Sequence, residues 1–454
     1  MSETRKELLV KILTQLHHGA SPEDVKEDFN RHFASVSAIE IAMMEQEIIN
    51  GPGPITFEDV LKLCNVHAEV FRGKIDPKIA DSMDHPGHPV RIFKDENYAF
   101  RACLMRIDNI IQALAELPED DPDLPDIWAG LCYQYRLLGE FDRHYERKEK
   151  LFFPILEKKG YTAPPKVMWA KDDEIRDLYR KVNRAIGEKS SSQIIDQLHK
   201  DFKEEFEGMI FKEEAILLNI LLESFEDEDW KQIAKESVAY GYAIIQPDVG
   251  QWLDEKEERE DTQMTAESTK MTLKAQVVQT TQIETNEGTI TLSWQPKQTD
   301  KVTAEPVVDR QTPIAFNHGT LSLDEIQLIM DHLSLEVTFV DKNDIFRYFN
   351  DAHPAEEMIF KRTPSQIGRS IELCHPPKAW PKVSQLLEDL RNKRRSSESM
   401  WFKRGDGVYV YVTYTGVYDK EGEFQGVLET VQDIQKFVNL ESPMKFDLSP
   451  LEES

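Results

Sequence analysis

The sequence contains no apolar run that approaches the roughly 20 residues needed to span a bilayer. Its first residues, 1–6, lead into an amphipathic stretch broken by Lys11 and Gln15, which is not the pattern of a signal peptide. Cysteine is also scarce: the four residues are scattered without a Cys-x-x-Cys pair, which fits reduced thiols. We therefore expect a cytoplasmic protein without a membrane span.

Positive charge is in short supply. The chain has 55 lysine and arginine residues against 83 aspartate and glutamate residues, which gives a formal net charge of −28. This charge repels nucleic-acid phosphates and anionic lipids, so we expect no nucleic-acid partner. A Walker A loop, a Gly-x-Ser-x-Gly elbow, a kinase signature and a recognisable DNA-reading helix are also missing from the sequence. An enzymatic activity is therefore poorly supported, and a binding or regulatory role is favoured.

The length of 454 residues exceeds one ordinary core and predicts about three structural units. In residues 1–80, leucine and isoleucine recur at helical spacing from Leu8 to Leu16, and Gly19 ends that pattern. Ser21-Pro22-Glu23-Asp24 then has the cap, the proline and the acids of a new helix start. This segment predicts a small all-helical module.

Longer helical patterns occupy residues 84–245. The predicted helices run from about 89 to 117, 124 to 156, 166 to 187 and 192 to 225, with proline, glycine or acidic turns between them. Four long helices with short connections favour an up-down four-helix bundle.

The composition changes again in the last third of the chain. Residues 246–315 contain a charge run and then a Thr/Gln-rich stretch, which predicts a linker. Residues 316–440 switch to period two around a hairpin-like turn at 341–344, and they also contain helical stretches, which predicts an α+β domain before a tail at 441–454. The fold class is therefore multidomain: an all-α N-terminal module, a four-helix bundle and an α+β domain.

One segment of the bundle, residues 141–154, interrupts a core-like helix with histidine and glutamate. Residues four apart share a helix face, so His144 and a carboxylate one turn later can reach the bundle centre together. A related segment, residues 208–218, carries Glu213. Imidazole and carboxylate groups on facing helices suit iron, so the bundle centre is a candidate metal site.

Segment 141–154 resembles the His-x-x-x-Glu-Glu-x-x-Leu-Phe-Pro pattern of hemerythrin-like (HHE) cation-binding domains. His88, which opens the first long helix, is similar to the lone first-helix ligand of that family. Upstream, Leu16-His17-His18-Gly19 and Leu63-Cys64-Asn65-Val66-His67-Ala68 resemble the domain of unknown function 438 (DUF438), which commonly precedes such a bundle. The resemblance covers residues from about 5 to 245 and implies a hemerythrin-like four-helix bundle.

The resemblance also implies a set of metal ligands. Two imidazoles would supply nitrogen and three carboxylates oxygen; these candidates are His88, His144, Glu149, Asp172 and Glu213. An iron bound between the helices without haem, or a haem, is the cofactor that this set suggests.

Three positions depart from the family pattern. Lys148 stands where the motif glutamate is expected, Met209 where the second motif histidine is expected, and Asp172 where a third histidine is expected. A full di-iron centre is therefore not predicted, and a mononuclear iron, a haem or a bundle without metal stay open. Lys148 can itself replace the charge of a cation by pairing with Glu213 or Asp172, because an unpaired buried charge is costly.

Residues from about 320 to 437 resemble a PAS domain, on the segments 337–341, 347–350, 367–370 and 426–434. The resemblance implies a five-stranded sheet around a small cavity, with ligand binding or dimer rearrangement passing a signal. Cys374 and His375 are candidate cofactor-binding residues, because haem iron commonly takes a histidine or cysteine ligand. A loop with a buried cysteine and a capping histidine is the structural alternative.

Together these features predict a cytoplasmic sensor or regulator that binds iron or haem, responds to redox state, oxygen or nitric oxide, and signals through its PAS-like domain to a protein partner. A small-molecule ligand or haem in that domain, and homodimerisation through it, belong to the same expectation. Two alternatives stay open: a non-haem iron protein that repairs iron–sulfur centres or handles oxygen or nitric oxide, and a metal-free interaction scaffold.

Overall fold

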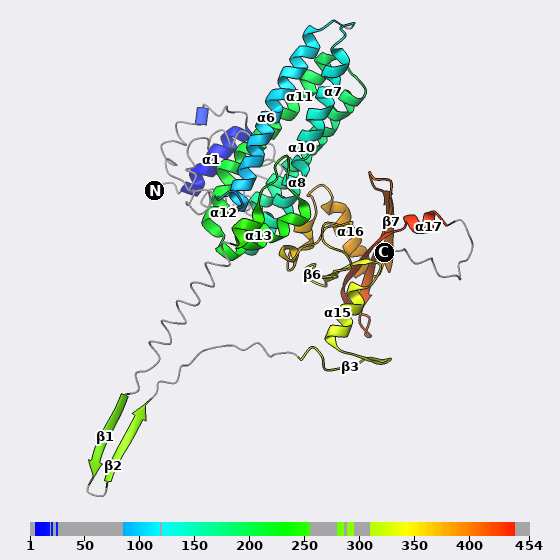
Figure 1. Cartoon of the computed structure of the whole chain (residues 1–454). Helices are drawn as coiled ribbons and strands as arrows, with labels where there is room; N and C mark the ends of the chain where they lie inside the picture. The colour runs from blue at the N-terminus through cyan, green and yellow to red at the C-terminus, as the bar shows by residue number, and fades with distance from the viewer. Residues whose placement is uncertain are drawn as a thin grey trace, which may run out of the picture. The chain divides into compact units, whose positions relative to one another are not determined.

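The computed structural model describes residues 5–18, 20, 24–25, 85–118, 120–254, 279–285, 288–294 and 309–440 (Figure 1). Most of the predicted module at 1–80, much of the predicted linker and the tail at 441–454 lie outside the described residues. Helix α1 (Arg5–His17) belongs to that module and ends just before Gly19, as predicted. The chain divides into two compact units, Met1–Pro247 with Met330–Ser454, and Asp248–Ile329, and each is described by itself.

Residues 89–240 form a helical region. Its α-helices are α6 (Pro89–Glu116), α7 (Leu124–Leu138), α8 (Phe141–Arg147), α9 (Phe153–Lys158), α10 (Ala163–Gly187), α11 (Ser192–Lys212), α12 (Leu218–Ser224) and α13 (Asp227–Tyr240). Two π-helical turns interrupt this series: η2 (Lys148–Phe152) joins α8 to α9, and η3 (Glu213–Leu217) joins α11 to α12.

These elements form the predicted four-helix bundle. Helix α6 packs against α7 and α11, and α10 packs against the same two helices, so the four long helices close a ring (Figure 1). The third helix begins at Ala163 instead of about residue 166, because Pro164 and Pro165 fall in its first turn, where the missing N–H groups have no intrahelical partner to lose. The start of α6 follows the same rule: His88 caps it and Pro89 is its first residue.

Helix α6 places a charged residue within the apolar core of the bundle. On α6, Phe93, Phe100 and Ile107 recur at seven-residue spacing and are completely buried. Glu96 lies on this same stripe, between the two phenylalanines, and its side chain is also completely buried. The helix therefore delivers one carboxylate into the apolar centre of the bundle.

The C-terminal domain is built on an antiparallel five-stranded sheet in the order β6-β5-β9-β8-β7. Its strands are β5 (Glu336–Asp341), β6 (Phe346–Phe349), β7 (Ser397–Lys403), β8 (Tyr409–Tyr418) and β9 (Phe424–Asp433). Its helical elements are η4 (Pro364–Gln366), η5 (Ile371–Cys374), α16 (Trp380–Arg391) and α17 (Gln435–Val438). This is the predicted α+β fold, and the predicted turn at 341–344 joins β5 to β6 with Asp344 at a φ of 60°.

Alternation along the strands sorts side chains between two faces. Val410 and Val412 of β8 are completely buried, whereas Tyr411 between them is 37% exposed. Strand β9 approaches β5 so closely at Gly426 that an added Cβ would lie 2.1 Å from the carbonyl oxygen of Val340. Since Gly426 also has a φ of 153°, only glycine fits this crossing without strain.

The second unit contains short strands. Strands β1 (Gln279–Thr285) and β2 (Gly288–Trp294) pair as an antiparallel hairpin, and β3 (Ile314–Ala315) pairs with β4 (Thr320–Leu321) before helix α15 (Leu323–Asp331). Only residues 289–292 show a weak strand pattern in the sequence, inside the predicted linker. The longer hairpin follows from threonine and isoleucine, whose branched side chains favour extended backbone. Within the described residues, no helix combines the length and the apolar character that a membrane crossing requires.

Candidate functional site

The centre of the bundle is organised around an ammonium group. The Nζ atom of Lys148 donates to Asp172 Oδ1 at 2.7 Å and to Glu213 Oε1 at 2.5 Å, and all three side chains are completely buried. The same Nζ lies 4.0 Å from the centre of the Tyr145 ring, whose π face favours a cation. The sequence suggested that Lys148 pairs with Glu213 or Asp172, and in the structure it pairs with both.

His144 connects this ammonium group to a second buried pair. Its Nε2 atom lies 3.2 Å from Glu213 Oε2, and its Nδ1 atom lies 2.7 Å from Glu96 Oε2. Glu96 also pairs with Arg147 and accepts the backbone N–H of Ala243 at 2.7 Å. A continuous polar network thus crosses the bundle from Arg147 to Asp172; we call it the buried charge network, and its members are Glu96, His144, Arg147, Lys148, Asp172 and Glu213.

Two π-helical turns deliver opposite partners to the network. Turn η2 begins at Lys148 and turn η3 begins at Glu213, the two residues that form the 2.5 Å contact. A π-helical turn accommodates an extra residue in the helix, so it changes which side chains face inward, and such turns are common at functional sites. Both predicted motif segments therefore depart from regular α-helix where their charged side chains meet.

Burial and ion pairing shift the pKa values of the two carboxyl groups that contact Lys148 in opposite directions. Burial favours the neutral acid, but Lys148 and His144 outweigh it at Glu213 and lower the pKa of that carboxyl to about 2. At Asp172 burial prevails over Lys148 and raises the pKa well above its ordinary value, and Asp172 Oδ2 has no hydrogen-bond partner. The same ammonium therefore contacts one carboxyl whose pKa is lowered, Glu213, and one whose pKa is raised, Asp172. Asp172 and Glu213 in turn outweigh burial at Lys148 and raise its pKa, so the amine stays charged.

The opposite pKa shifts predict opposite effects of two neutralising substitutions. Asp172→Asn should raise the unfolding temperature at pH 7. Burial raises the pKa of Asp172 in the folded chain, so ionisation of this residue favours the unfolded chain at that pH, and asparagine removes the effect. The increase in unfolding temperature should shrink below about pH 4. Glu213→Gln should lower the stability at pH 7 by about 2–3 kcal/mol, because Lys148 loses its ionised partner. The stability that Glu213 contributes is present above its ordinary pKa and is lost as the pH falls toward 2. Thermal unfolding of both variants between pH 3 and pH 7 measures the contrast, and equal losses at pH 7 would contradict it.

The two other candidate ligands in the bundle have different partners. His88 is the N-cap of α6, where its Nδ1 atom accepts the backbone N–H of Val90 at 3.1 Å and its ring lies 5.1 Å from the ring of Trp230. Glu149 forms a two-pronged pair with Arg176, at 2.7 and 3.2 Å. The structure therefore brings His144, Asp172 and Glu213 into one network, whereas capping and ion pairing account for the positions of His88 and Glu149. Their role as ligands stays a prediction.

Three family descriptions match the chain, in this order: "Family of unknown function (DUF438)" over residues 9–77, "Hemerythrin HHE cation binding domain" over residues 88–221, and "PAS domain" over residues 326–435. The chain is a DUF438–hemerythrin–PAS protein. The order of these domains agrees with the sequence prediction, although most of the DUF438 region lies outside the described residues. Among curated proteins, none matches the chain.

Solved structures are similar to parts of the chain. The C-terminal domain of a protein from Streptococcus mutans is 55% identical over 29% of this chain and 100% of that chain, with a TM-score of 0.29. The PAS domain of a protein from Colwellia psychrerythraea is 16% identical over 25% of this chain and 98% of its own, with a TM-score of 0.20. A sensory box sensor histidine kinase from Vibrio cholerae is 15% identical over 24% of this chain and 89% of its own, with a TM-score of 0.19.

The hemerythrin family is described as cation binding, and the side chains of this hemerythrin domain do not fit an iron centre while Lys148 is in place. The ammonium group already holds one oxygen of Asp172 and one of Glu213, so a positive charge already lies between these two carboxylates. An ammonium offers three donors and no lone pair, so it cannot act as a ligand. Within the described parts of the chain, no three histidine, cysteine, aspartate or glutamate side chains are arranged to hold a metal.

A half-open cavity of about 310 Å³ is lined mainly by the PAS domain, and both predicted cofactor-binding residues line it. Burial raises the pKa of Cys374, which keeps its sulfur as a thiol. Burial also lowers the pKa of His375 to about 4, so its ring is neutral at neutral pH. The Nδ1 atom of His375 faces the carbonyl oxygen of Ile371 at 2.9 Å and must therefore donate to it, which leaves Nε2 as an acceptor. Their role in cofactor binding stays a prediction.

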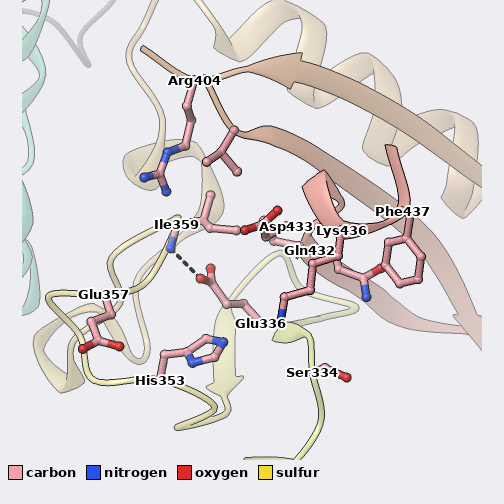
Figure 2. A pocket seen from close by; sticks show the side chains of 12 residues that line it. Ser334, Glu336, His353, Glu357, Ile359, Arg404, Gln432, Asp433, Lys436 and Phe437 are labelled. Atoms are coloured by element: carbon pink, nitrogen blue, oxygen red, sulfur yellow. Dashed lines mark hydrogen bonds between the residues drawn. The ribbon is translucent and has the colours of Figure 1, made fainter. Parts of the chain in front are cut away.

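A second cavity of about 590 Å³ lies along the same face of the sheet, since Glu336 and Thr338 of β5 alternate onto that face and line one cavity each. Figure 2 shows the carboxylate of Glu336 pointing to the backbone of Ile359, whose N–H it accepts at 2.5 Å; it also accepts the N–H of Phe360 at 3.1 Å. Arg404, at the edge of this cavity, forms an ion pair with Asp406. Glu336 and Arg404 thus already have partners within the PAS domain.

Proposed function

We propose that this protein is a sensor in which the PAS domain binds a small molecule and the hemerythrin domain passes the occupancy of that site to a protein partner. One observation carries the proposal: the wall of the 310 Å³ cavity includes Lys150, which belongs to turn η2 of the hemerythrin domain. A ligand shifts a conformational equilibrium only when it contacts the two states differently. A molecule that touches both domains meets this requirement directly.

Further contacts between the domains support the coupling. Arg369 of the PAS domain pairs with both oxygens of Glu157 at 2.6 and 2.8 Å and donates to the carbonyl oxygen of Glu149 at 3.3 Å. Arg369 and Glu157 are almost completely buried. Gln366 of η4 donates to the hydroxyl of Tyr240 at 3.0 Å. A change in the PAS wall therefore acts on side chains that are fixed to the bundle.

The sensor proposal has a direct test. Mass spectrometry of small molecules released by denaturing the freshly purified full-length chain should identify a bound compound in an amount comparable to the protein. A chain that releases nothing, and whose unfolding temperature no small molecule changes, would rule the sensor role out.

For the bundle we propose a structural role in which Lys148 supplies the positive charge that iron supplies in a metal-loaded relative. The second candidate, an iron protein of the repair or oxygen-handling type, is favoured by the HHE family match and by the meeting of His144, Asp172 and Glu213. A haem, bound in the bundle or near Cys374 and His375, is the third possibility.

One measurement on the freshly purified full-length chain separates these three candidates. We expect an iron content far below one atom per chain and no visible absorption. A Soret band would establish haem, and near-ultraviolet charge-transfer bands with two irons per chain would establish the di-iron alternative; either result contradicts the structural role.

The proposal includes a cytoplasmic location and association with a protein, with a second copy of the chain as the simplest partner. Strand β7 supports the second part, because Met400, Trp401 and Phe402 are exposed by 45, 67 and 38%. Sedimentation of the full-length chain tests self-association, and a monomer at all concentrations would exclude it.

A further inference from the structure

The PAS cavity has two kinds of wall. Phe346, Phe360 and Ile371 contribute apolar surface, and Tyr414 contributes an aromatic ring whose hydroxyl stays protonated because burial raises its pKa. A volume of about 310 Å³ lies near the lower end of ligand sites in proteins, which begins at roughly 300 Å³. The cavity therefore suits a compact molecule with an apolar body.

The other wall carries three cations that face two carboxylates. Arg369 pairs with Glu157 at 2.6 Å, and Arg362 pairs with Glu429 at 3.0 Å. Lys150 is the third cation, and within the described parts of the chain no carboxylate forms an ion pair with it. The cavity wall thus has one positive charge without an acidic partner.

The surroundings of Lys150 do not neutralise it. Its Nζ atom lies 3.5 Å from the carbonyl oxygen of Cys374 and 4.6 Å from the centre of the Trp169 ring, and neither of these groups carries a full negative charge. Burial, together with the nearby Arg369, outweighs the opposing charge of Glu149 and lowers the pKa of Lys150 to about 8. Glu149 is itself paired with Arg176 at 2.7 Å. Cys374 and His375 are neutral beside it, so they add no compensating charge.

We propose that the PAS cavity binds a small organic monocarboxylate whose carboxylate group pairs with Lys150 of the hemerythrin domain. The single unpaired cation matches one negative charge, and the aromatic wall matches an apolar body. Because Lys150 belongs to the bundle and the rest of the wall to the PAS domain, the carboxylate links the two domains and strengthens their contact when it binds. This inference rests on the proposed sensor function and names the chemical class of its ligand.

The test uses the full-length chain with benzoate and hexanoate as probes, and benzamide and hexanamide as uncharged controls of the same shape. Isothermal titration should show saturable binding of at least one acid, with its amide weaker by about tenfold or more, because a hydrogen bond to a charged partner is lost. Lys150→Met should abolish this preference, whereas Lys150→Arg should retain it. Lys158→Met, a change in the neighbouring helix α9 outside the cavity wall, should bind like the unmodified chain.

Three results would overturn the carboxylate proposal: equal binding of acid and amide, unchanged acid binding in Lys150→Met, or no binding of either acid. The unfolding temperature of each variant without probe shows whether it folds, and Lys150→Arg provides a folded comparison if Lys150→Met does not. These outcomes leave the sensor function intact if a neutral or cationic molecule is released from the purified chain. The sensor function fails only if nothing is released and no small molecule stabilises the protein.

Discussion

Replacing Lys148 by methionine is expected to lower the free energy of unfolding of the hemerythrin domain by about 3–5 kcal/mol. Methionine keeps most of the side-chain length, so the loss reflects charge more than an empty space. Asp172 and Glu213, which contact the ammonium at 2.7 and 2.5 Å, would remain buried without a counter-ion. Urea unfolding of the full-length chain, followed by far-ultraviolet circular dichroism, measures the loss.

Lys200→Ala is the matched control for this experiment. Lys200 also forms an ion pair, with Asp196 at 2.6 Å, but its side chain is 65% exposed. The control should therefore lose less than about 1 kcal/mol. If Lys148→Met were as stable as Lys200→Ala, the ammonium would not hold the bundle centre together.

A companion variant, Lys148→Ala, compares the ammonium with a metal. It removes the charge and also leaves space among His144, Asp172 and Glu213, whose nitrogen and oxygen atoms suit divalent transition metals. Added Mn²⁺ or Zn²⁺ should then raise the unfolding temperature of Lys148→Ala and leave that of the unmodified chain unchanged. An equal response of both proteins would mean that the metal acts elsewhere.

Arg369→Ala is expected to weaken the contact between the PAS and hemerythrin domains by about 3–5 kcal/mol. The substitution removes both hydrogen bonds to Glu157, a carboxylate that is only 5% exposed, and it leaves that charge without its partner. It also removes the donor to the carbonyl oxygen of Glu149. Hydrogen exchange should rise in α9 and η4 while the interior of α11 stays protected.

A surface arginine of the same domain provides the comparison. Arg347 pairs with Asp341 at 2.6 Å, but its side chain is 55% exposed, so Arg347→Ala should change exchange only locally. Glu157→Gln removes the hemerythrin-domain partner of Arg369. A double-mutant cycle with Arg369→Ala and Glu157→Gln then isolates the interaction energy between the two residues. Independent, additive effects of the two substitutions would refute the importance of this pair.

The helices and the α+β domain could be predicted because they depend on patterns that repeat along the chain. Apolar spacing marked the four bundle helices, and the turn at 341–344 marked the first hairpin of the sheet. The motif around His144 also led to the pairing of Lys148 with Asp172 and Glu213, because substitution of an expected ligand by a cation leaves the remaining acids in need of a partner.

The other buried contacts could not be predicted from spacing alone, because their partners are far apart in sequence. Glu96 joins His144 across 48 positions, and Arg369 joins Glu157 across 212. Charged helix residues usually face solvent, so Arg147 and Lys150 gave no signal. Glu96 did give one, since it lies on the same helix stripe as Phe93 and Phe100.

Turn η2 ties two properties of the protein to the same five residues. Its first residue, Lys148, fixes the centre of the bundle, and two positions later Lys150 enters the PAS cavity. A substitution that converts this π-helical turn into regular α-helix would reorient both amines at once. Substitutions in this turn that are selected for a new ligand would therefore also alter the stability of the bundle. The ligand specificity of the PAS domain and the folding stability of the hemerythrin domain must evolve together.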